Sequence, residues 1–337
     1  MPLHLRFGTE DLLRCRFALS PLCETHEAVR TLRRTERHSY HLPWLRRIHG
    51  AVADLDLSPL WLLMPVTGGY TPDFLGPPPT SSVAASFGDE LEQMRACDPS
   101  LAGAEIARSL ACTPGAAESA RGRAMLEDPA RAVRELADLT QRAWEALVAP
   151  DWPRVRDLLE ADIAYRARQL AETGLEGLFT DLHPGRVSWR EGRLSVRTAF
   201  RDVMVQELDG RGVLLVPSAF IWPDVVSGFA PPWQPTVLYP ARGVGGLWQR
   251  PTPDSVQALA GLLGPNRAAV LAELEEPAST TSLAVRLGLA PSSVSAHLSA
   301  LRDAGLLTSR RAHRHVLYER TPLGIALLAG GAGPAPS

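Results

Sequence analysis

The feature that most restricts the fold of this chain is a pair of helical patterns between residues 279 and 307. In the first, Leu283 and Leu287 share one helical face, and Gly288 is expected to end the helix, because a positive φ costs a glycine little. Pro291 opens the second pattern, where its missing N–H is harmless. The apolar stripe of the second helix consists of Val294, Leu298 and Leu301. Two short helices joined by a tight turn predict a helix-turn-helix motif.

A basic hairpin is predicted directly after the second helix, which Gly305 is expected to end. Residues 306–311 and 314–319 can pair as two strands, since Val316 and Tyr318 alternate with outward-facing residues. The basic side chains at its tip, with no acid among them, are Arg310, Arg311, His313, Arg314 and His315. An arginine-rich hairpin beside a recognition helix is typical of the wing of a winged helix.

These motifs resemble the ArsR-type winged-helix transcriptional regulators. The residues that carry the resemblance are Leu283-x3-Leu287-Gly288-Leu289, Ser292-x-Val294-Ser295-x-His297-Leu298-x2-Leu301, Ala304-Gly305-Leu306-Leu307 and the basic hairpin. The resemblance implies DNA binding and a dimer formed through the outer helices of the domain. The best-known members sense metals, but this sequence has no cysteine after Cys112, so the thiolate site near the recognition helix is absent.

One position departs from the family pattern. Ala290 stands where the family usually has Ser or Thr, just before the proline that opens the second helix. Losing that N-cap oxygen costs about 1 kcal/mol. We expect either that a neighbouring group caps the helix or that this region is looser without DNA.

The expected DNA contacts lie on the outward face of the second helix and on the hairpin. Small outward side chains suit a helix that lies deep in a major groove, and serine hydroxyls can bind bases or phosphates. No Asn, Gln or Arg on the first two turns can read a base with two hydrogen bonds, so part of the specificity should come from the hairpin and from DNA shape. The predicted DNA-binding residues are Thr280, Ser292, Ser293, Ser295, His297, Ser299, Arg310, Arg311, His313, Arg314 and His315. A winged helix that binds protein instead is the alternative.

The flanks of this module carry more apolar residues than so small a domain can bury. They are Val256, Leu259, Leu262, Leu263 and the run 323–328. We therefore predict a homodimer, whose two-fold symmetry would match palindromic half-sites.

The chain of 337 residues is long enough for two domains. The net charge of −2 gives no global attraction to nucleic acid or anionic lipid. Its four cysteines form no CxxC pair, which favours a reducing cytoplasm. The sequence predicts neither a secretory signal nor a membrane span.

We expect an α+β chain in which a large domain of helices and antiparallel sheet precedes the winged helix-turn-helix domain. The predicted segments are residues 1–248 for the first domain, 249–253 for a linker, 254–329 for the DNA-binding domain and 330–337 for a disordered tail. The first domain also resembles an uncharacterised domain that precedes winged helices in actinobacterial regulators. This resemblance rests on His41–Trp44, Pro72–Leu75, Asp181–Pro184 and Pro232–Pro235.

Within the first domain, residues 91–111 and 129–149 predict helices, and the proline-rich residues 70–82 predict an exposed, rigid loop. After Gly174 the pattern changes from helical to alternating. The expected strands form a hairpin over 186–197 and continue at 213–216 and 236–239. Short links between them favour antiparallel pairing.

Aromatic residues near prolines predict an apolar pocket for a small effector, since ligand pockets are lined by aromatic groups with few polar ones. The six candidates are Trp44, Tyr70, Phe74, Trp222, Trp233 and Tyr239. The alternative is that these residues only pack the core of a large domain.

Catalytic and metal sites are less well supported. Asp181 and His183 could orient each other for acid–base chemistry, but no nucleophile or second base accompanies them. The histidines at 38, 41 and 49, with Asp54 and Asp56, match no standard metal-ligand spacing. We expect no metal and no cofactor.

The sequence therefore predicts a cytoplasmic, homodimeric regulator, most simply a repressor, that binds double-stranded DNA and senses a small effector or partner through its first domain. We expect no membrane association and no enzymatic activity. The alternatives are an enzyme in residues 1–248 with the winged helix as an autoregulatory module, and a protein-interaction scaffold.

Overall fold

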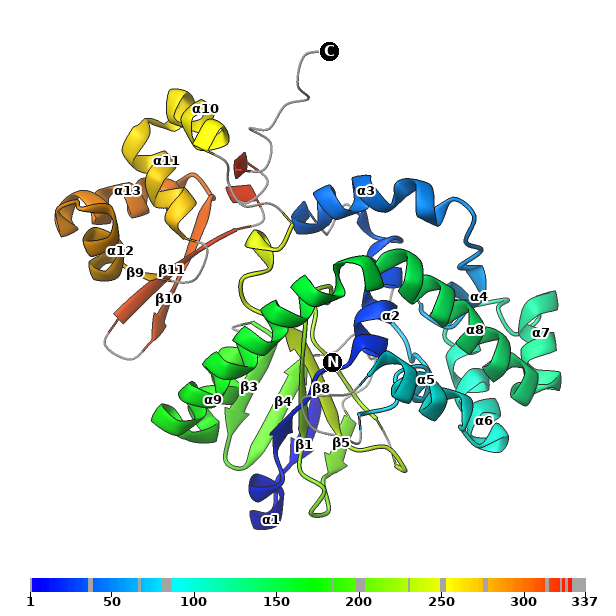
Figure 1. Ribbon diagram of the computed structural model, residues 1–337. Coiled ribbons are helices and arrows are strands. Elements are labelled where there is room, and N and C mark those ends of the chain that lie inside the picture. The colour runs from blue at the N-terminus through cyan, green and yellow to red at the C-terminus, as the bar shows by residue number, and fades with distance from the viewer. Residues whose placement is uncertain are drawn as a thin grey trace. The chain divides into compact units, whose positions relative to one another are not determined.

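The computed structural model divides the chain into two compact units (Figure 1). Met1–Arg34 and Ile48–Ala241 form the first unit, and Thr35–Arg47 and Arg242–Ser337 form the second. The residues that the structure describes are 2–35, 39–65, 68–79, 86–183, 185–197, 204–229, 231–248, 253–274, 278–312, 315–321, 323–324 and 327–328. The expected α+β class and the order of the two domains are confirmed, whereas the domain boundaries read from the sequence stay a prediction.

One sheet of the first unit has four strands in the order β3-β4-β1-β5. These strands are β1 (Pro2–Arg6), β3 (Val187–Arg190), β4 (Arg193–Arg197) and β5 (Met204–Glu207). Glu191 and Gly192 join β3 to β4 with φ values of 50° and 70°, as a two-residue type I′ turn requires. The predicted hairpin is therefore present.

The second sheet has the order β2-β6-β8-β7. Its strands are β2 (Arg16–Phe17), β6 (Leu214–Ser218), β7 (Val226–Ser227) and β8 (Thr236–Pro240). Every residue of β6 and β8 is buried, as expected of strands covered on both faces. Here the pairing is mixed rather than antiparallel, since β6 pairs with β2 and β8 in parallel, and β1 also pairs with β5 in parallel. The long segment between β6 and β8 allows this crossover.

Helices make up the rest of the first unit. They are α1 (Thr9–Leu13), α2 (Pro21–Thr31), α4 (Ser58–Leu62), α5 (Phe87–Arg95), α6 (Pro99–Leu110), α7 (Ala120–Glu127), α8 (Pro129–Leu147) and α9 (Trp152–Leu182). The predicted helix over 129–149 is confirmed by α8. The helix expected over 91–111 is two helices, because the Asp98 carboxylate caps a new start at Pro99. No helix in the described ranges is both long and apolar enough to span a membrane.

Helix α9 continues past Gly174, after which the sequence pattern was expected to change from helical to alternating. Gly174, at φ 67°, breaks the helix, but the residues up to Leu182 are helical again. Arg166 bridges the break, because its Nη1 donates to Asp181 Oδ2 at 2.6 Å. Its Nε lies 3.8 Å from Asp162 Oδ1, and the hydroxyl of Tyr239 donates to Asp162 Oδ2 at 2.9 Å. This buried network joins both parts of α9 to β8.

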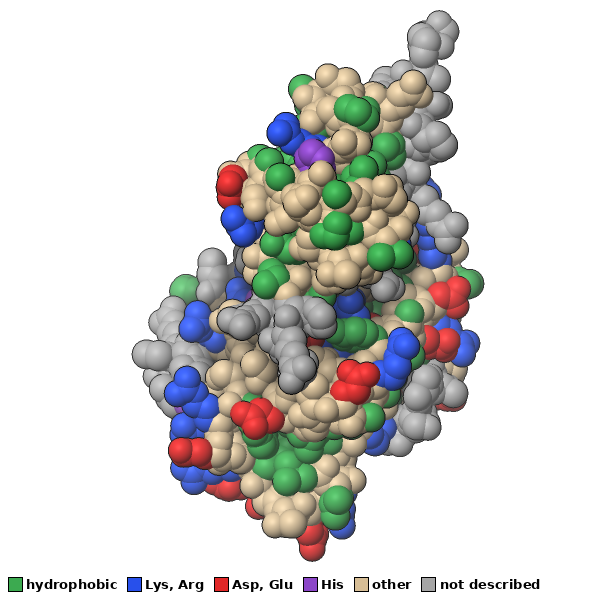
Figure 2. Space-filling model, turned by 90° about the vertical axis from the view of Figure 1, so that its left-hand side faces the viewer, with side chains coloured by type: hydrophobic (Ala, Val, Ile, Leu, Met, Phe, Trp, Pro, Cys, Tyr) green, Lys and Arg blue, Asp and Glu red, His purple; other side chains and the backbone are tan. Residues whose placement is uncertain are grey.

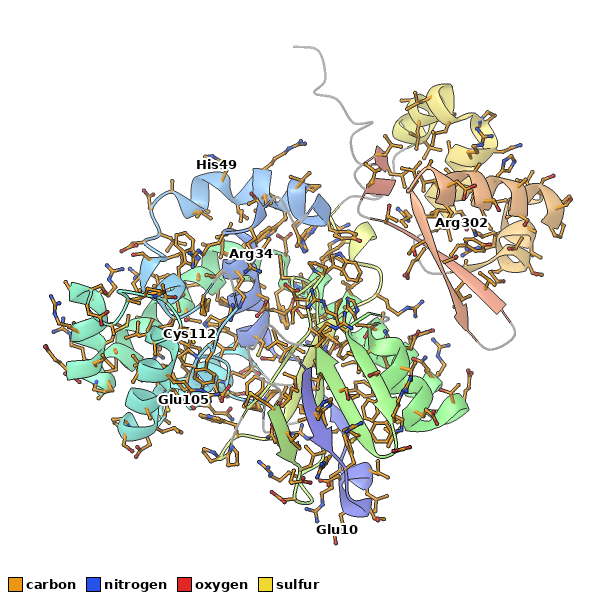
Figure 3. All side chains as sticks on the ribbon, turned by 180° about the vertical axis from the view of Figure 1, so that it is seen from behind. Glu10, Arg34, His49, Glu105, Cys112 and Arg302 are labelled. Atoms are coloured by element: carbon orange, nitrogen blue, oxygen red, sulfur yellow. The ribbon has the colours of Figure 1, made fainter. Side chains whose placement is uncertain are left out.

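The proline-rich segment at residues 70–79 is buried, not exposed as the sequence suggested. Glu105 on α6 accepts hydrogen bonds from the backbone N–H of Phe74 and from Trp233 Nε1, each at 2.9 Å. The backbone N–H of Tyr70 donates to Cys112 Sγ at 3.2 Å, and Glu105 and Cys112 both lie in the part of the unit around α6 (Figure 3). The segment can be buried because its polar groups have partners.

Nearly all of α2 is buried, although it contains Glu24, His26 and Glu27. Burial raises the pKa of Glu24 to about 8, and its Oε2 accepts a hydrogen bond from the backbone N–H of Ala219 at 3.0 Å. The Nε2 of His26 lies 3.1 Å from the hydroxyl of Thr140 on α8. Polar side chains therefore connect α2 to its surroundings inside the unit.

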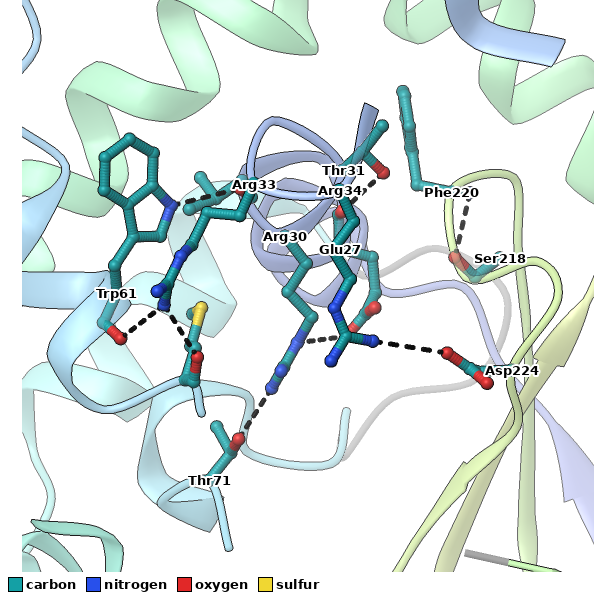
Figure 4. A network of polar contacts seen from close by, with 12 residues as sticks. Glu27, Arg30, Thr31, Arg33, Arg34, Trp61, Thr71, Ser218, Phe220 and Asp224 are labelled. Carbon is teal, nitrogen blue, oxygen red and sulfur yellow. Dashed lines mark hydrogen bonds and ion pairs between the residues drawn. The ribbon is translucent and has the colours of Figure 1, made fainter. Parts of the chain in front are cut away.

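The C-terminal end of α2 is anchored by arginines (Figure 4). Arg30 donates to Glu27 at 3.1 Å and to Thr71 at 2.7 Å, while Arg33 donates to the carbonyl of Trp61 at 3.0 Å. Burial raises the pKa of Glu27, and the charge of Arg30 offsets part of that rise. The helix end is thereby held to two separate chain segments.

Candidate nucleic-acid interface

The second unit contains four consecutive helices and a three-stranded sheet (Figure 1). The helices are α10 (Pro253–Leu263), α11 (Pro265–Glu273), α12 (Thr280–Leu287) and α13 (Pro291–Asp303). The strands are β9 (Ala278–Ser279), β10 (Leu307–Ala312) and β11 (His315–Arg320), in the order β10-β11-β9. The predicted pair of helices corresponds to α12 and α13, and the predicted hairpin to β10 and β11.

The turn between α12 and α13 follows from local sequence chemistry. The hydroxyl of Ser279 accepts a hydrogen bond from the backbone N–H of Ser282 and caps the start of α12. Gly288 ends α12 in the left-handed conformation, at φ 64° and ψ 28°. The next N–H, of Leu289, bonds back to the carbonyl of Ala284 at 3.1 Å. These bonds fix the angle at which the chain enters α13.

The apolar stripe of α13 determines which residues face outward. Val294, Leu298 and Leu301 are almost wholly buried in a core that also contains Leu283 of α12. Ser292, Ser293 and Ser295 are consequently exposed, whereas Thr280, His297 and Ser299 are half-buried. In the space-filling view, the upper part of the visible face shows apolar side chains among tan atoms and few charged side chains (Figure 2).

Ala290 leaves the start of α13 without a side-chain cap, as the sequence predicts. Its φ of −65° and ψ of 137° are extended, as N-cap residues usually are. Ala290→Ser should therefore stabilise the second unit by about 1 kcal/mol, because the serine hydroxyl can accept a bond from a free N–H of the first turn. Thermal unfolding of the two proteins would measure the gain, with Ala296→Ser, in the interior of α13, as the control. An equal effect of both variants would contradict the capping argument.

The hairpin is attached to the helix-turn-helix through β9. Leu317 and Tyr318 of β11 pair with Ser279 and Ala278, so the hairpin is held next to the start of α12. Within the hairpin, Arg311 lies opposite Val316. The backbone at Arg310, Arg311 and His315 lies in the strands, but their side chains, and all of His313 and Arg314, are outside the described part of the structure.

The second unit also includes a segment from early in the sequence. Residues 35–47 lie in it, and they include the first turns of α3 (Leu42–Val52). Trp248 Nε1 donates to His41 Nδ1 at 2.8 Å, and Trp44 stacks on Trp248 with ring centres 6.0 Å apart. Burial and then the charge of Glu319 on β11 raise the pKa of Tyr40. Sequence reasoning missed this association, because nothing local links residues so far apart.

The six aromatic candidates for an effector pocket are divided between the two units, and two of them in the first unit, Phe74 and Trp233, both donate to Glu105. Trp44 belongs to the second unit and the other five to the first. The hydroxyl of Tyr239 donates to Asp162 and the Nε1 of Trp233 donates to Glu105, while Trp222 stacks on His183 at 5.4 Å. An effector pocket made of these residues stays a prediction.

Asp181 and His183, the two residues of the catalytic alternative, have described contacts in the first unit. The Asp181 carboxylate accepts a hydrogen bond from Arg166, and the ring of His183 stacks on Trp222. Among the residues with described positions, no group of three or more His, Cys, Asp or Glu could hold a metal ion. Burial lowers the pKa of His183.

Comparison with known protein families agrees with this geometry. Residues 262–310 match a family model described as a helix-turn-helix domain. The second unit contains a helix-turn-helix domain. Residues 81–245 match a family of unknown function, DUF5937. Neither a curated protein nor a solved structure matches the chain. The helix-turn-helix domain supports a DNA-binding transcription regulator.

Proposed function

We propose that this protein is a transcriptional repressor of the ArsR type that binds operator DNA through α13. The observation that carries the proposal is the serine face of α13. It is exposed because the opposite face is buried, and it lies inside a region that matches a helix-turn-helix model. In such domains the second helix enters the major groove with its N-terminal residues next to the bases.

In the proposed interface, α13 contacts the major groove and the hairpin contacts the phosphates or the minor groove. Ser292, Ser293 and Ser295 meet the groove, with His297 and Ser299 at its margin and Thr280 near the backbone. Arg311 and Arg314 grip phosphates or the minor groove, as do the neighbouring residues Arg310, His313 and His315. Serines give modest base discrimination, so DNA shape supplies part of the specificity.

A homodimer fits the exposed apolar surface of the second unit. Leu262 on α10 is 73% exposed and Leu323 is 57% exposed. Large apolar side chains on a small domain favour contact with another protein surface, and a second copy would supply the two-fold symmetry of a palindromic operator. In this proposal the first unit senses a small effector or partner in the cytoplasm.

The experiment that tests this function is selection of binding sites by the full chain from a pool of random duplexes. The expected result is an enriched inverted repeat, and footprinting across the genome would then locate the regulated genes. If no duplex sequence is enriched above the input pool, the proposal fails.

A double substitution in the hairpin tests the second half of the interface. Arg311→Ala with Arg314→Ala should weaken binding to every duplex and make the slope of log K against log salt shallower by about 0.9 for each phosphate that is no longer neutralised. Fluorescence anisotropy at several salt concentrations measures this slope. Arg267→Ala, an exposed arginine on α11, is the control. An unchanged slope in the double variant would exclude the hairpin from the interface.

A further inference from the structure

Three arginines lie side by side on the outward face of the sheet β3-β4-β1-β5. Arg190 on β3 is opposite Arg193 on β4, and Arg193 is opposite Arg6 on β1. Residues directly opposite each other on neighbouring antiparallel strands have Cβ atoms about 5 Å apart. All three side chains are exposed. Three positively charged residues therefore lie in one row across the sheet.

This row of arginines should lower the stability of the sheet, because like charges directly opposite each other on neighbouring strands are destabilising. Arg6 has an acidic partner, since its Nη1 lies 3.2 Å from Glu207 Oε1. Arg190 and Arg193 make no side-chain hydrogen bond or ion pair with any residue whose position is described. Their charges are available for an anion from outside the chain.

The rest of this face of β1, β3 and β4 carries no acid. Behind the arginine row, Ser188 is opposite Ser195 and Ser195 is opposite His4, whose Nδ1 lies 2.8 Å from the Ser195 hydroxyl. Arg197, at the far end of β4, is also exposed. Among the described side chains of these three strands, those that face outward are therefore cations or neutral hydrogen-bonding groups.

The arginine row lines a hollow of about 370 Å³. Its lining also includes Glu191, Glu207, Phe7, Gly8 and Gly192, so the three arginines outnumber the two acids there. Pockets for small effectors are concave and mostly apolar, whereas this hollow is polar and arginine-rich. The hollow therefore suits a large charged molecule that lies along the sheet better than a small molecule enclosed in a pocket.

The dimensions favour a polyanion. Neighbouring strands are about 4.8 Å apart and residues along a strand about 3.3 Å apart, so the arginines span about 10 Å across the sheet and about 13 Å along β4. Duplex DNA carries a negative charge every 1.7 Å or so of its axis, hence several phosphates over that span. One guanidinium group can donate two parallel hydrogen bonds to the oxygens of a phosphate.

We propose that this face of the first unit is a second DNA-binding surface, which contacts the phosphate backbone of the duplex without reading its sequence. The inference rests on the proposed function, because the helix-turn-helix supplies the reason for duplex DNA to be the polyanion. It gives the first unit a direct part in DNA affinity, in addition to any sensing.

The test uses the full chain carrying Arg190→Gln, Arg193→Gln and Arg197→Gln. The slope of log K against log salt should become shallower by about 0.9 per phosphate no longer neutralised, or about 2–3 for the three, while the ranking of duplex sequences stays unchanged. The matched control removes three exposed helical arginines of the same unit, Arg134→Gln, Arg154→Gln and Arg168→Gln. Equal slope changes in both triple variants would show general electrostatics and overturn the proposal.

Photocrosslinking gives a second readout that does not depend on the stability of the triple variant. A benzophenone amino acid at Ser188, which is exposed on the same face, should capture labelled duplex, whereas the same group at the exposed Ala161 of α9 should not. Absence of capture at Ser188 by a chain that binds DNA would overturn the proposal. A different result would also overturn it: the native chain binds pyrophosphate, the triple variant does not, and the salt slope of the triple variant on DNA is unchanged. The face would then be a site for a small anion.

The two proposals fail in different ways. If the native chain enriches no duplex, the proposed function is wrong and the second surface has no ligand. If the native chain binds its operator and the hairpin variant changes the salt slope, but the sheet variant does not, only the second surface is rejected.

Discussion

Replacing Arg166 by methionine should destabilise the first unit by about 3–5 kcal/mol, the usual cost of removing one partner from a buried ion pair. The Arg166 side chain is 3% exposed and contacts two carboxylates, Asp181 at 2.6 Å and Asp162 at 3.8 Å. Methionine would fill much of the same volume but would remove the guanidinium that contacts both acids. Burial and the charge of Asp162 raise the pKa of Tyr239, so its hydroxyl remains a donor and cannot replace the arginine.

Urea unfolding followed by circular dichroism measures this loss. Arg156→Met on the same helix is the matched control, because Arg156 pairs with Glu160 at 2.7 Å but its side chain is 52% exposed, and exposed pairs contribute up to about 1 kcal/mol. Adding Asp162→Asn and Asp181→Asn to Arg166→Met should recover part of the stability, since no buried charge would remain unpaired. If Arg166→Met and Arg156→Met cost the same, the buried network does not stabilise the two parts of α9.

Substituting glutamate at both Ser292 and Ser295 should weaken operator binding by at least 100-fold, or about 2.8 kcal/mol at about 1.4 kcal/mol per factor of ten. The proposed interface places both positions beside DNA, where like charges cost several kcal/mol. The fold should tolerate the change, because both side chains are exposed and an acid at position 292 lies in the first turn of α13, where it is favourable. Binding and folding effects are thereby separated.

The matched control is Ala161→Glu with Ala171→Glu, two exposed positions of α9 that receive the same charge. Anisotropy titrations should show a much smaller loss for the control, while melting temperatures of both variants stay near that of the native chain. Ser295→Ala then refines the assignment, because a base contact alters the relative affinities of operator variants and a phosphate contact lowers all of them equally. Binding that survives both glutamates would remove α13 from the interface.

The helix-turn-helix could be predicted because its signals are local. Gly288, Pro291 and the leucine spacing each determine structure within a few residues, and the same spacing indicates which serines face outward. The first unit is determined by long-range contacts. Glu24 on α2 would be expected on a surface, but it accepts a backbone hydrogen bond from Ala219, far away in sequence.

The same limitation explains two of the errors in the first unit. Prolines at residues 72–79 suggested an exposed loop, and only the distant Glu105 shows how that segment can be buried. The parallel pairing of β6 with β8 likewise depends on a crossover rather than on strand composition. The arginine row on the sheet could not be predicted from the sequence either, because Arg6 and Arg193 become neighbours only through the register of their strands.

The second unit draws on two separate regions of the gene. A fragment that begins at residue 249 would omit Trp44 and Trp248, two buried indole rings that stack on each other. Such a fragment would therefore lack part of the core of this unit, although the sequence predicts a linker at residues 249–253. Recombination that exchanges this unit between regulators would have to transfer both regions of the sequence together.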